Sequence, residues 1–171
     1  MSVVALKKNK SGIIDVVSDS ICVRGYTKMQ DTMKFAKLFR GNDAVFGGAG
    51  HATELTLLQA YSQTHLIGKN PTINSVLNYL VEFCDYKKKL VDKWVLESEV
   101  LIVPLFGESI FQGNTDMGIW EIEEYSALGA GMDYALAALY LGKSAEDSVK
   151  TACALSIYCS LPTNIEQVHR K

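Results

Sequence analysis

The sequence lacks the features that mark several large classes of protein. No apolar run is long enough to span a membrane, and the first twenty residues contain no signal-peptide core. Cysteine is scarce, with four residues and no C-x-x-C pair, which favours reduced core thiols over a disulfide framework or a zinc site. The three histidines are far apart and form no ligand set. We therefore expect a cytoplasmic protein that binds no metal and no cofactor.

Strong net charge and flexible linkers are absent as well. The formal net charge is −2 and the basic residues are scattered, which argues against nucleic acid or an anionic membrane as a partner. The chain has only three prolines, no low-complexity tract and no internal repeat. With 171 residues it can bury a sizeable core, and we expect one domain that spans residues 1–171.

The chain begins with strand patterns, in which β-branched residues are frequent and turn residues separate the runs. These strands are expected at residues 3–6, 13–17, 20–26, 34–40 and 44–46. Apolar residues then recur every three or four positions from Thr53 and again over 72–93, which predicts two helices.

Strand patterns return after the second helix. The runs "EVLIVPLF" and "SIFQGN" flank Gly107-Glu108, a hairpin signal, and "GIWEIEEYSALG" adds extended sequence. Two helices close the chain, one ending at Gly142 and the other starting at Ser144, a good N-cap. This order predicts an α+β fold, a four-layer αββα sandwich of two antiparallel sheets flanked by helix pairs.

Three segments are informative together. They are "SVVALKKNKSGIIDVVSDS", "MKFAKLFRGNDAVFGGAGHATELTLL" and "EEYSALGAGMDYALAALYLGKSAEDSVKTACALS". In this order they resemble the opening hairpin, the lysine-bearing strand with its Ala-Gly turn and helix, and the A-x-G-x-G turn with the last two helices of one family. That family is the proteasome β-subunit and HslV family of amino-terminal-nucleophile hydrolases. The resemblance covers most of the chain and implies the same αββα sandwich.

The resemblance also implies an activity, peptide-bond hydrolysis by an amino-terminal nucleophile. In this family the first side chain is the nucleophile and its own α-amine, whose pKa is near neutrality, serves as the base. A nearby lysine favours the deprotonated amine, and glycine N–H groups hold the oxyanion. The family implies ring-shaped homo-oligomers and, for the HslV branch, an ATP-driven unfoldase partner. This sequence has no nucleotide-binding loop of its own.

Carried over by position, the resemblance assigns roles to three residues. Asp19 matches the family aspartate at the end of the second strand, and Gly50 matches the oxyanion glycine. Lys34 matches the active-site lysine, with Lys37 as a less favoured register. An aspartate and a lysine close together in a partly buried site would form an ion pair that each of them needs.

The sequence departs from the family pattern at several positions. Met1 falls where the family has its amino-terminal threonine, so Ser2 becomes the nucleophile only if Met1 is removed, which the small size of serine allows. The family serine before the third helix falls on Ala130, and the acid near the end of the last helix falls on Ser156. Two side chains of the catalytic network are therefore missing.

Two hypotheses remain open at this point. The first is a peptidase that uses Ser2 with Lys34, Asp19 and the Gly50 amide. The alternative is a catalytically inactive relative that keeps the fold as a structural, self-assembling component of a larger complex. The retained Asp19 and Lys34 favour the enzyme, whereas the changes at Ala130 and Ser156 favour the structural component.

Overall fold

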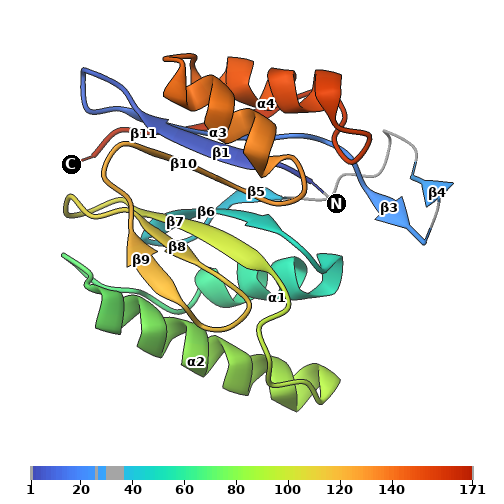
Figure 1. The fold of residues 1–171 in the computed structure, drawn as a ribbon. Coiled ribbons are helices and arrows are strands. Elements are labelled where there is room, and N and C mark those ends of the chain that lie inside the picture. Colours follow the sequence, from blue (N-terminus) through green and yellow to red (C-terminus); the bar gives the residue numbers. More distant parts are fainter. Residues whose placement is uncertain (1, 26, 30–36, 171) are drawn as a thin grey trace.

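The structure is a computed structural model that describes residues 2–25, 27–29 and 37–170. Two antiparallel sheets and four helices stack in four layers (Figure 1). The first sheet has the strand order β10-β1-β2-β11 and the second the order β5-β6-β7-β8-β9. This arrangement confirms the predicted αββα sandwich.

The strands of the first sheet come from both ends of the chain. They are β1 (Val4–Lys8), β2 (Ile14–Ser18), β10 (Tyr125–Leu128) and β11 (Asn164–Val168). The strands of the second sheet come from the middle of the chain. They are β5 (Leu38–Arg40), β6 (Ala44–Ala49), β7 (Glu99–Pro104), β8 (Phe111–Gly113) and β9 (Ile119–Glu121).

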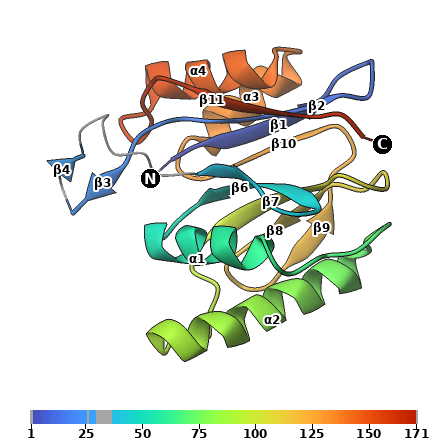
Figure 2. The same ribbon diagram turned by 180° about the vertical axis from the view of Figure 1, so that it is seen from behind.

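Each sheet has a helix pair on its outer face, as Figure 2 shows from behind. The pair α1 (Ala52–Ser62) and α2 (Ile73–Val91) covers the second sheet, and α3 (Met132–Tyr140) and α4 (Ala145–Leu155) cover the first. None of the described helices is long and apolar enough to cross a membrane.

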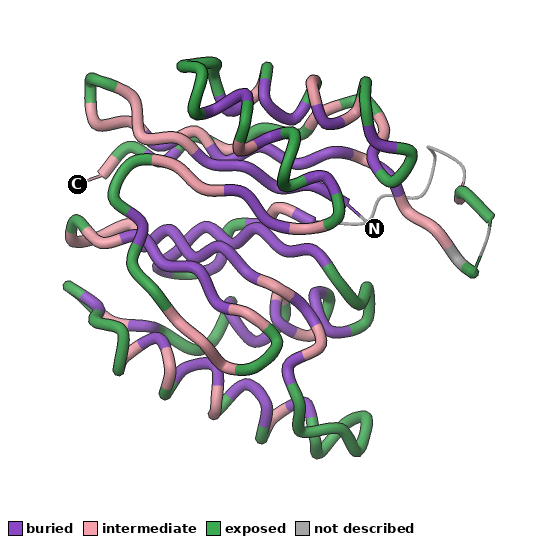
Figure 3. Tube along the Cα trace, viewed as in Figure 1, coloured by how far each residue is buried: buried purple, intermediate pink, exposed green. Residues whose placement is uncertain are grey.

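Side chains of the central strands alternate between the layers, because successive residues of a strand point to opposite faces. Val4 and Leu6 of β1 pack between the two sheets in the same core as Leu101, whereas Ala5 faces α3 and α4. Ile102, the neighbour of Leu101, packs toward α1 and α2. The central strands are therefore buried on both faces (Figure 3), which accounts for their near-continuous apolar sequence.

The helix ends follow the local signals in the sequence. The Ser144 side chain accepts a hydrogen bond from the Asp147 N–H and caps α4, and Gly142 follows α3 with φ +85°. Thr72 and Ser75 form a capping box at the start of α2. The predicted helix over 72–93 is confirmed to within two residues at its carboxyl end.

The last part of the chain differs from the prediction. The last helix ends at Leu155, and the chain then forms β11, an edge strand that pairs antiparallel with β2. The two helices predicted to close the chain therefore do not close it. Of the five residues of β11 only Val168 is buried, so the strand carries no alternating apolar signal.

The segment after β2 also differs from the prediction. In place of a strand over 20–26, a short hairpin of β3 (Val23–Arg24) and β4 (Thr27–Lys28) projects from the sandwich at the end where β1 begins (Figures 1 and 2). Within the predicted strand 34–40, β5 covers Leu38–Arg40, and residues 34–36 lie outside the described residues.

Two substitutions in β11 test whether this strand closes the core. Val168→Ala removes two methyl groups from a fully buried site between the sheets and should lower the free energy of unfolding by about 1–3 kcal/mol. The control is Ile165→Ala, on the same strand but 46% exposed, which should change it by less than about 1 kcal/mol. Urea denaturation measures both, and equal losses would contradict the placement of β11.

Candidate functional site

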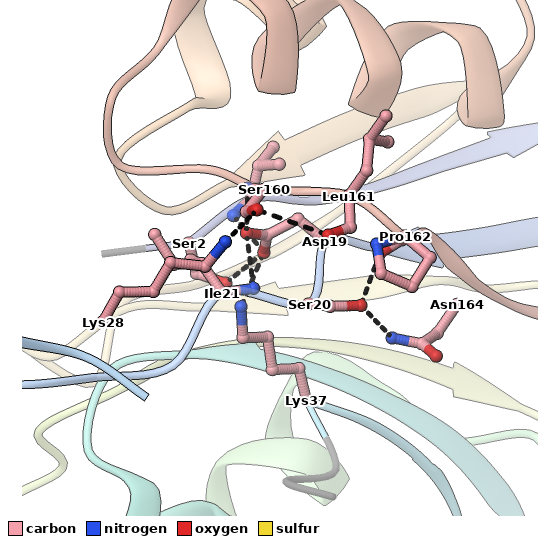
Figure 4. Close-up of polar contacts among 11 residues, drawn as sticks. Ser2, Asp19, Ser20, Ile21, Lys28, Lys37, Ser160, Leu161, Pro162 and Asn164 are labelled. Atoms are coloured by element: carbon pink, nitrogen blue, oxygen red, sulfur yellow. Dashed lines mark hydrogen bonds and ion pairs between the residues drawn. The ribbon is translucent and has the colours of Figure 1, made fainter. Parts of the chain in front are cut away.

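The Asp19 carboxylate is the centre of a buried polar cluster at one end of the sandwich. Asp19 directly follows β2, has no exposed surface and accepts five hydrogen bonds (Figure 4). Three donors converge on its Oδ1 and two on its Oδ2. The Oδ1 donors are the Ser2 hydroxyl, the Val3 N–H and the Lys37 ammonium. The Oδ2 donors are the N–H groups of Ile21 and Ser160.

The register of the first hairpin places Ser2 beside Asp19. Val4 of β1 pairs with Ser18 of β2, so the residues just before β1 lie opposite the residue just after β2. The Asp19 N–H donates to the Val3 carbonyl at 3.1 Å and continues the ladder by one step. Ser2 is only 1% exposed, and its hydroxyl donates a hydrogen bond to Asp19 Oδ1 at 2.7 Å.

Lys37, just before β5, completes an ion pair with Asp19. Its Nζ lies 2.7 Å from Asp19 Oδ1, and the two side chains are 5% and 0% exposed. Burial lowers the pKa of the Lys37 ammonium below its ordinary value, and the Asp19 carboxylate opposes this shift. The Ser2 hydroxyl and the Lys37 ammonium thus share one carboxylate oxygen.

The turn between β10 and α3 holds the Ser2 backbone. The Gly131 N–H donates to the Ser2 carbonyl at 3.1 Å. Gly129 has φ +87°, and a Cβ there would lie 2.6 Å from the Ser2 carbonyl oxygen, so glycine is required by both conformation and space. The β1 end is therefore fixed through its main chain as well as through the Ser2 hydroxyl.

A cavity of about 600 Å³ opens beside Ser2 and Lys37. Gly50, in the turn between β6 and α1, lines the cavity with Cys22, His51 and Glu97. The Gly48 N–H donates to the Lys37 carbonyl at 2.7 Å, and N–H directions alternate along an extended chain. Gly50 follows two residues later in the turn after β6 and lines the same cavity as Lys37.

The predicted site residues are brought together only in part. Ser2 and Asp19 are in direct contact, and Gly50 lies on the same cavity. Lys34 lies outside the described residues, and Lys37, the register that we favoured less, makes the ion pair with Asp19.

The two positions that depart from the family pattern also have described places. Ala130 is exposed in the turn between β10 and α3, beside Gly131. Ser156 is the C-cap of α4, and its hydroxyl accepts a hydrogen bond from the Tyr158 N–H at 3.2 Å. Among the described residues, neither of these side chains bonds to Asp19 or Ser2.

Sequence reasoning ranked one contribution to the site second and missed another. Lys37 belongs to a lysine-rich stretch in which spacing alone does not separate one register from the next. The Ser160 N–H donates to Asp19 Oδ2 at 3.1 Å, and any residue except proline could supply it. No side-chain pattern signals such a backbone donor.

Comparison with known proteins places this geometry in a known fold. No protein-family model matches the chain, and no curated protein is significantly similar to it. Among solved structures, BPH of Thiobacillus denitrificans in complex with epoxomicin superposes with a TM-score of 0.81 at 21% identity, over 99% of both chains. BPH described without that compound gives 0.80 at 20% identity, over 100% of this chain and 99% of the other.

A third structure decides the fold type. The eukaryotic HslV of Trypanosoma brucei superposes with a TM-score of 0.69 at 16% identity, over 96% of this chain and 98% of that one. The chain has the HslV fold. The resemblance stated from the three sequence segments is thus confirmed for the fold, and the HslV-like sandwich spans nearly the whole chain.

Two acid-to-amide substitutions test how strongly the ion pair is built into this HslV-like fold. Asp19→Asn leaves the buried Lys37 ammonium without its counter-charge and should destabilise the protein by about 3–5 kcal/mol. The control Glu166→Gln breaks the ion pair between Glu166, 36% exposed, and Arg40, 45% exposed. It should lower the free energy of unfolding by less than about 1 kcal/mol. Chemical denaturation measures both, and a small loss for Asp19→Asn would show that the cluster is not a buried ion pair in solution.

Proposed function

We propose that the chain is an HslV-like peptidase whose nucleophile is the Ser2 hydroxyl, with Ser2 as the mature amino terminus. One observation carries the proposal. The Ser2 hydroxyl is bonded to an aspartate that is ion-paired with a buried lysine, beside a cavity that Gly50 also lines. A lysine, an aspartate and a hydroxyl at the first residue are the groups that this chemistry needs.

The proposed reaction uses the Ser2 α-amine as its base. Once Met1 is removed, this amine takes the proton from the Ser2 hydroxyl while the oxygen attacks the substrate carbonyl. The oxyanion is held by the Gly50 N–H, and the amine returns the proton to the leaving amino group. Water then hydrolyses the ester to Ser2. Lys37 supplies positive charge that favours the unprotonated amine, and Asp19 holds Lys37 and the hydroxyl in place.

We also propose that the protein assembles with copies of itself. Large apolar side chains remain exposed around the ends of α3 and α4, with Tyr140 at 80%, Leu141 at 76% and Ile157 at 84%. Such side chains are typical of surfaces that a partner covers. The ring and the ATP-driven partner that the family implies belong to this proposal. A structural component without activity is the alternative if Met1 stays in place, because the α-amine would then belong to the wrong residue.

The first experiment uses protein purified without a tag. It measures the intact mass of the protein and its hydrolysis of a peptide library. We expect loss of Met1, measurable hydrolysis, and binding of epoxomicin, the compound present in the BPH structure. Ser2→Ala and Lys37→Ala should each lower kcat/KM by at least about 10²-fold, since they remove the nucleophile and its cation. Lys34→Ala is the matched control, because Lys34 is the other candidate for the active-site lysine, and this variant should keep near wild-type activity.

The outcomes separate the two readings. Retention of Met1, or full activity of Ser2→Ala, would overturn the Ser2 mechanism. Loss of activity in Lys34→Ala with activity kept in Lys37→Ala would assign the catalytic lysine to the other register.

The proposed mechanism also predicts a bell-shaped pH dependence of kcat/KM. Activity should rise as the Ser2 amine loses its proton, and the ordinary pKa of an α-amino group is about 7.7–8.0. Activity should fall again as Lys37 loses its proton, and burial lowers its pKa, so this fall should begin below 10.5. Lys37→Arg should shift the upper limb to higher pH. An upper limb that is the same in both proteins would exclude Lys37 as its source.

A further inference from the structure

Three consecutive residues before and at the start of β7 contact the two turns that border the site. These are the turn between β6 and α1 and the turn between β10 and α3. Glu97, Ser98 and Glu99 are called the strut here. Ser98 and Glu99 each make a hydrogen bond to one of these turns, Glu97 makes hydrogen bonds to the start of α1, and none of the three belongs to the Ser2–Asp19–Lys37 cluster. The strut therefore needs an explanation of its own.

The first two strut residues hold the turn that carries Gly50. The Ser98 hydroxyl, in a fully buried residue, accepts the His51 N–H at 3.0 Å. A Cβ on Gly50, whose φ is +153°, would lie 2.5 Å from that hydroxyl oxygen, so the turn and the strut are in close contact. The Glu97 N–H donates to both carboxylate oxygens of Glu54, at 3.1 and 2.9 Å, in the first turn of α1.

A second buried ion pair locks this contact in place. Lys87 of α2 lies 2.5 Å from Glu54 Oε1, and the side chains are 1% and 2% exposed. Lys87 also donates to the Val95 carbonyl, just before the strut. A buried ion pair is weak evidence for stability because desolvation offsets much of the attraction. Its geometric effect is clearer, since it joins α1, α2 and the segment before β7 at one point.

The third strut residue holds the turn on the other side of the site. Glu99 Oε2 accepts the Gly129 N–H at 2.9 Å. The same turn, between β10 and α3, also binds the Ser2 carbonyl through the Gly131 N–H. One continuous backbone segment thus links the turn that carries Gly50 to the β10–α3 turn, which binds the Ser2 carbonyl.

We propose that Ser98 and Glu99 are positioning residues that set the placement of the Ser2 hydroxyl relative to the Gly50 N–H. This inference rests on the proposed function and assigns Ser98 and Glu99 a role in catalysis without contact to substrate. A displacement of about 1 Å between reacting groups can lower a rate about 10²-fold. Because neither Ser98 nor Glu99 lines the cavity, the loss of either side chain should lower kcat and leave KM nearly unchanged.

The test compares Ser98→Ala and Glu99→Ala with Glu99→Gln. Both alanine variants should lower kcat at least about 10-fold with KM within about threefold of wild type. Glu99→Gln should restore most of kcat, because its amide oxygen can still accept the Gly129 N–H. Amide hydrogen exchange over residues 49–54 should be faster in Ser98→Ala than in wild type.

Matched controls separate positioning from general damage to the fold. Ser62→Ala removes an equally buried hydroxyl at the other end of α1, and Glu121→Ala removes an exposed carboxylate from β9 of the same sheet. Both should keep wild-type kcat. If Ser98→Ala does not fold, the Glu99 pair still decides, because both of its members change the same side chain.

Two different failures can be distinguished. An active wild-type protein whose Ser98→Ala and Glu99→Ala variants behave like the controls would overturn the strut and leave the proposed function intact. A fall in kcat that Glu99→Gln does not reverse would also overturn the role of Glu99. An inactive wild-type protein with a free Ser2 would overturn the proposed function, and with it the catalytic role of the strut.

Discussion

The buried carboxylate of Asp19 is the constraint that organises the site end of the sandwich. A carboxylate without access to water is tolerated only where its oxygens are satisfied by donors and its charge by a cation. Its donors come from the start of β1, the chain after β2, the residue before β5 and the loop after α4. Segments that are far apart in the sequence must therefore converge here, and the ends of both sheets are fixed by that convergence.

The close approach of the two sheets depends on small residues as much as on apolar ones. A Cβ at Gly47 of β6 would lie 2.7 Å from Val4 Cγ1, and one at Gly48 would lie 2.3 Å from Leu55 Cδ2. The glycines let β6 pack against β1 on one side and α1 on the other. This packing places the Gly50 turn, which continues from β6, beside the start of β1, and so joins the core to the candidate site.

The layers of the fold could be predicted from the sequence because each central strand is buried on both faces and is therefore a near-continuous run of apolar residues. The exact lysine could not, because Lys34 and Lys37 both fall within the strand predicted over 34–40 and the sequence alone does not say which of them faces Asp19. The strand β11 was missed for a related reason. An edge strand held by backbone hydrogen bonds needs few apolar side chains, and only Val168 is buried.

The side chains missing at Ala130 and Ser156 weigh less against a working site than their loss first suggests. Next to Ala130, the Gly131 N–H binds the Ser2 carbonyl, and after Ser156 the Ser160 N–H binds Asp19. Both contacts come from the main chain, which keeps its donors through almost any substitution. The same turns thus still hold the Ser2 backbone and Asp19 in position. What the family pattern would add at these two positions is side-chain chemistry, whereas the main-chain donors that hold the Ser2 carbonyl and Asp19 are present here.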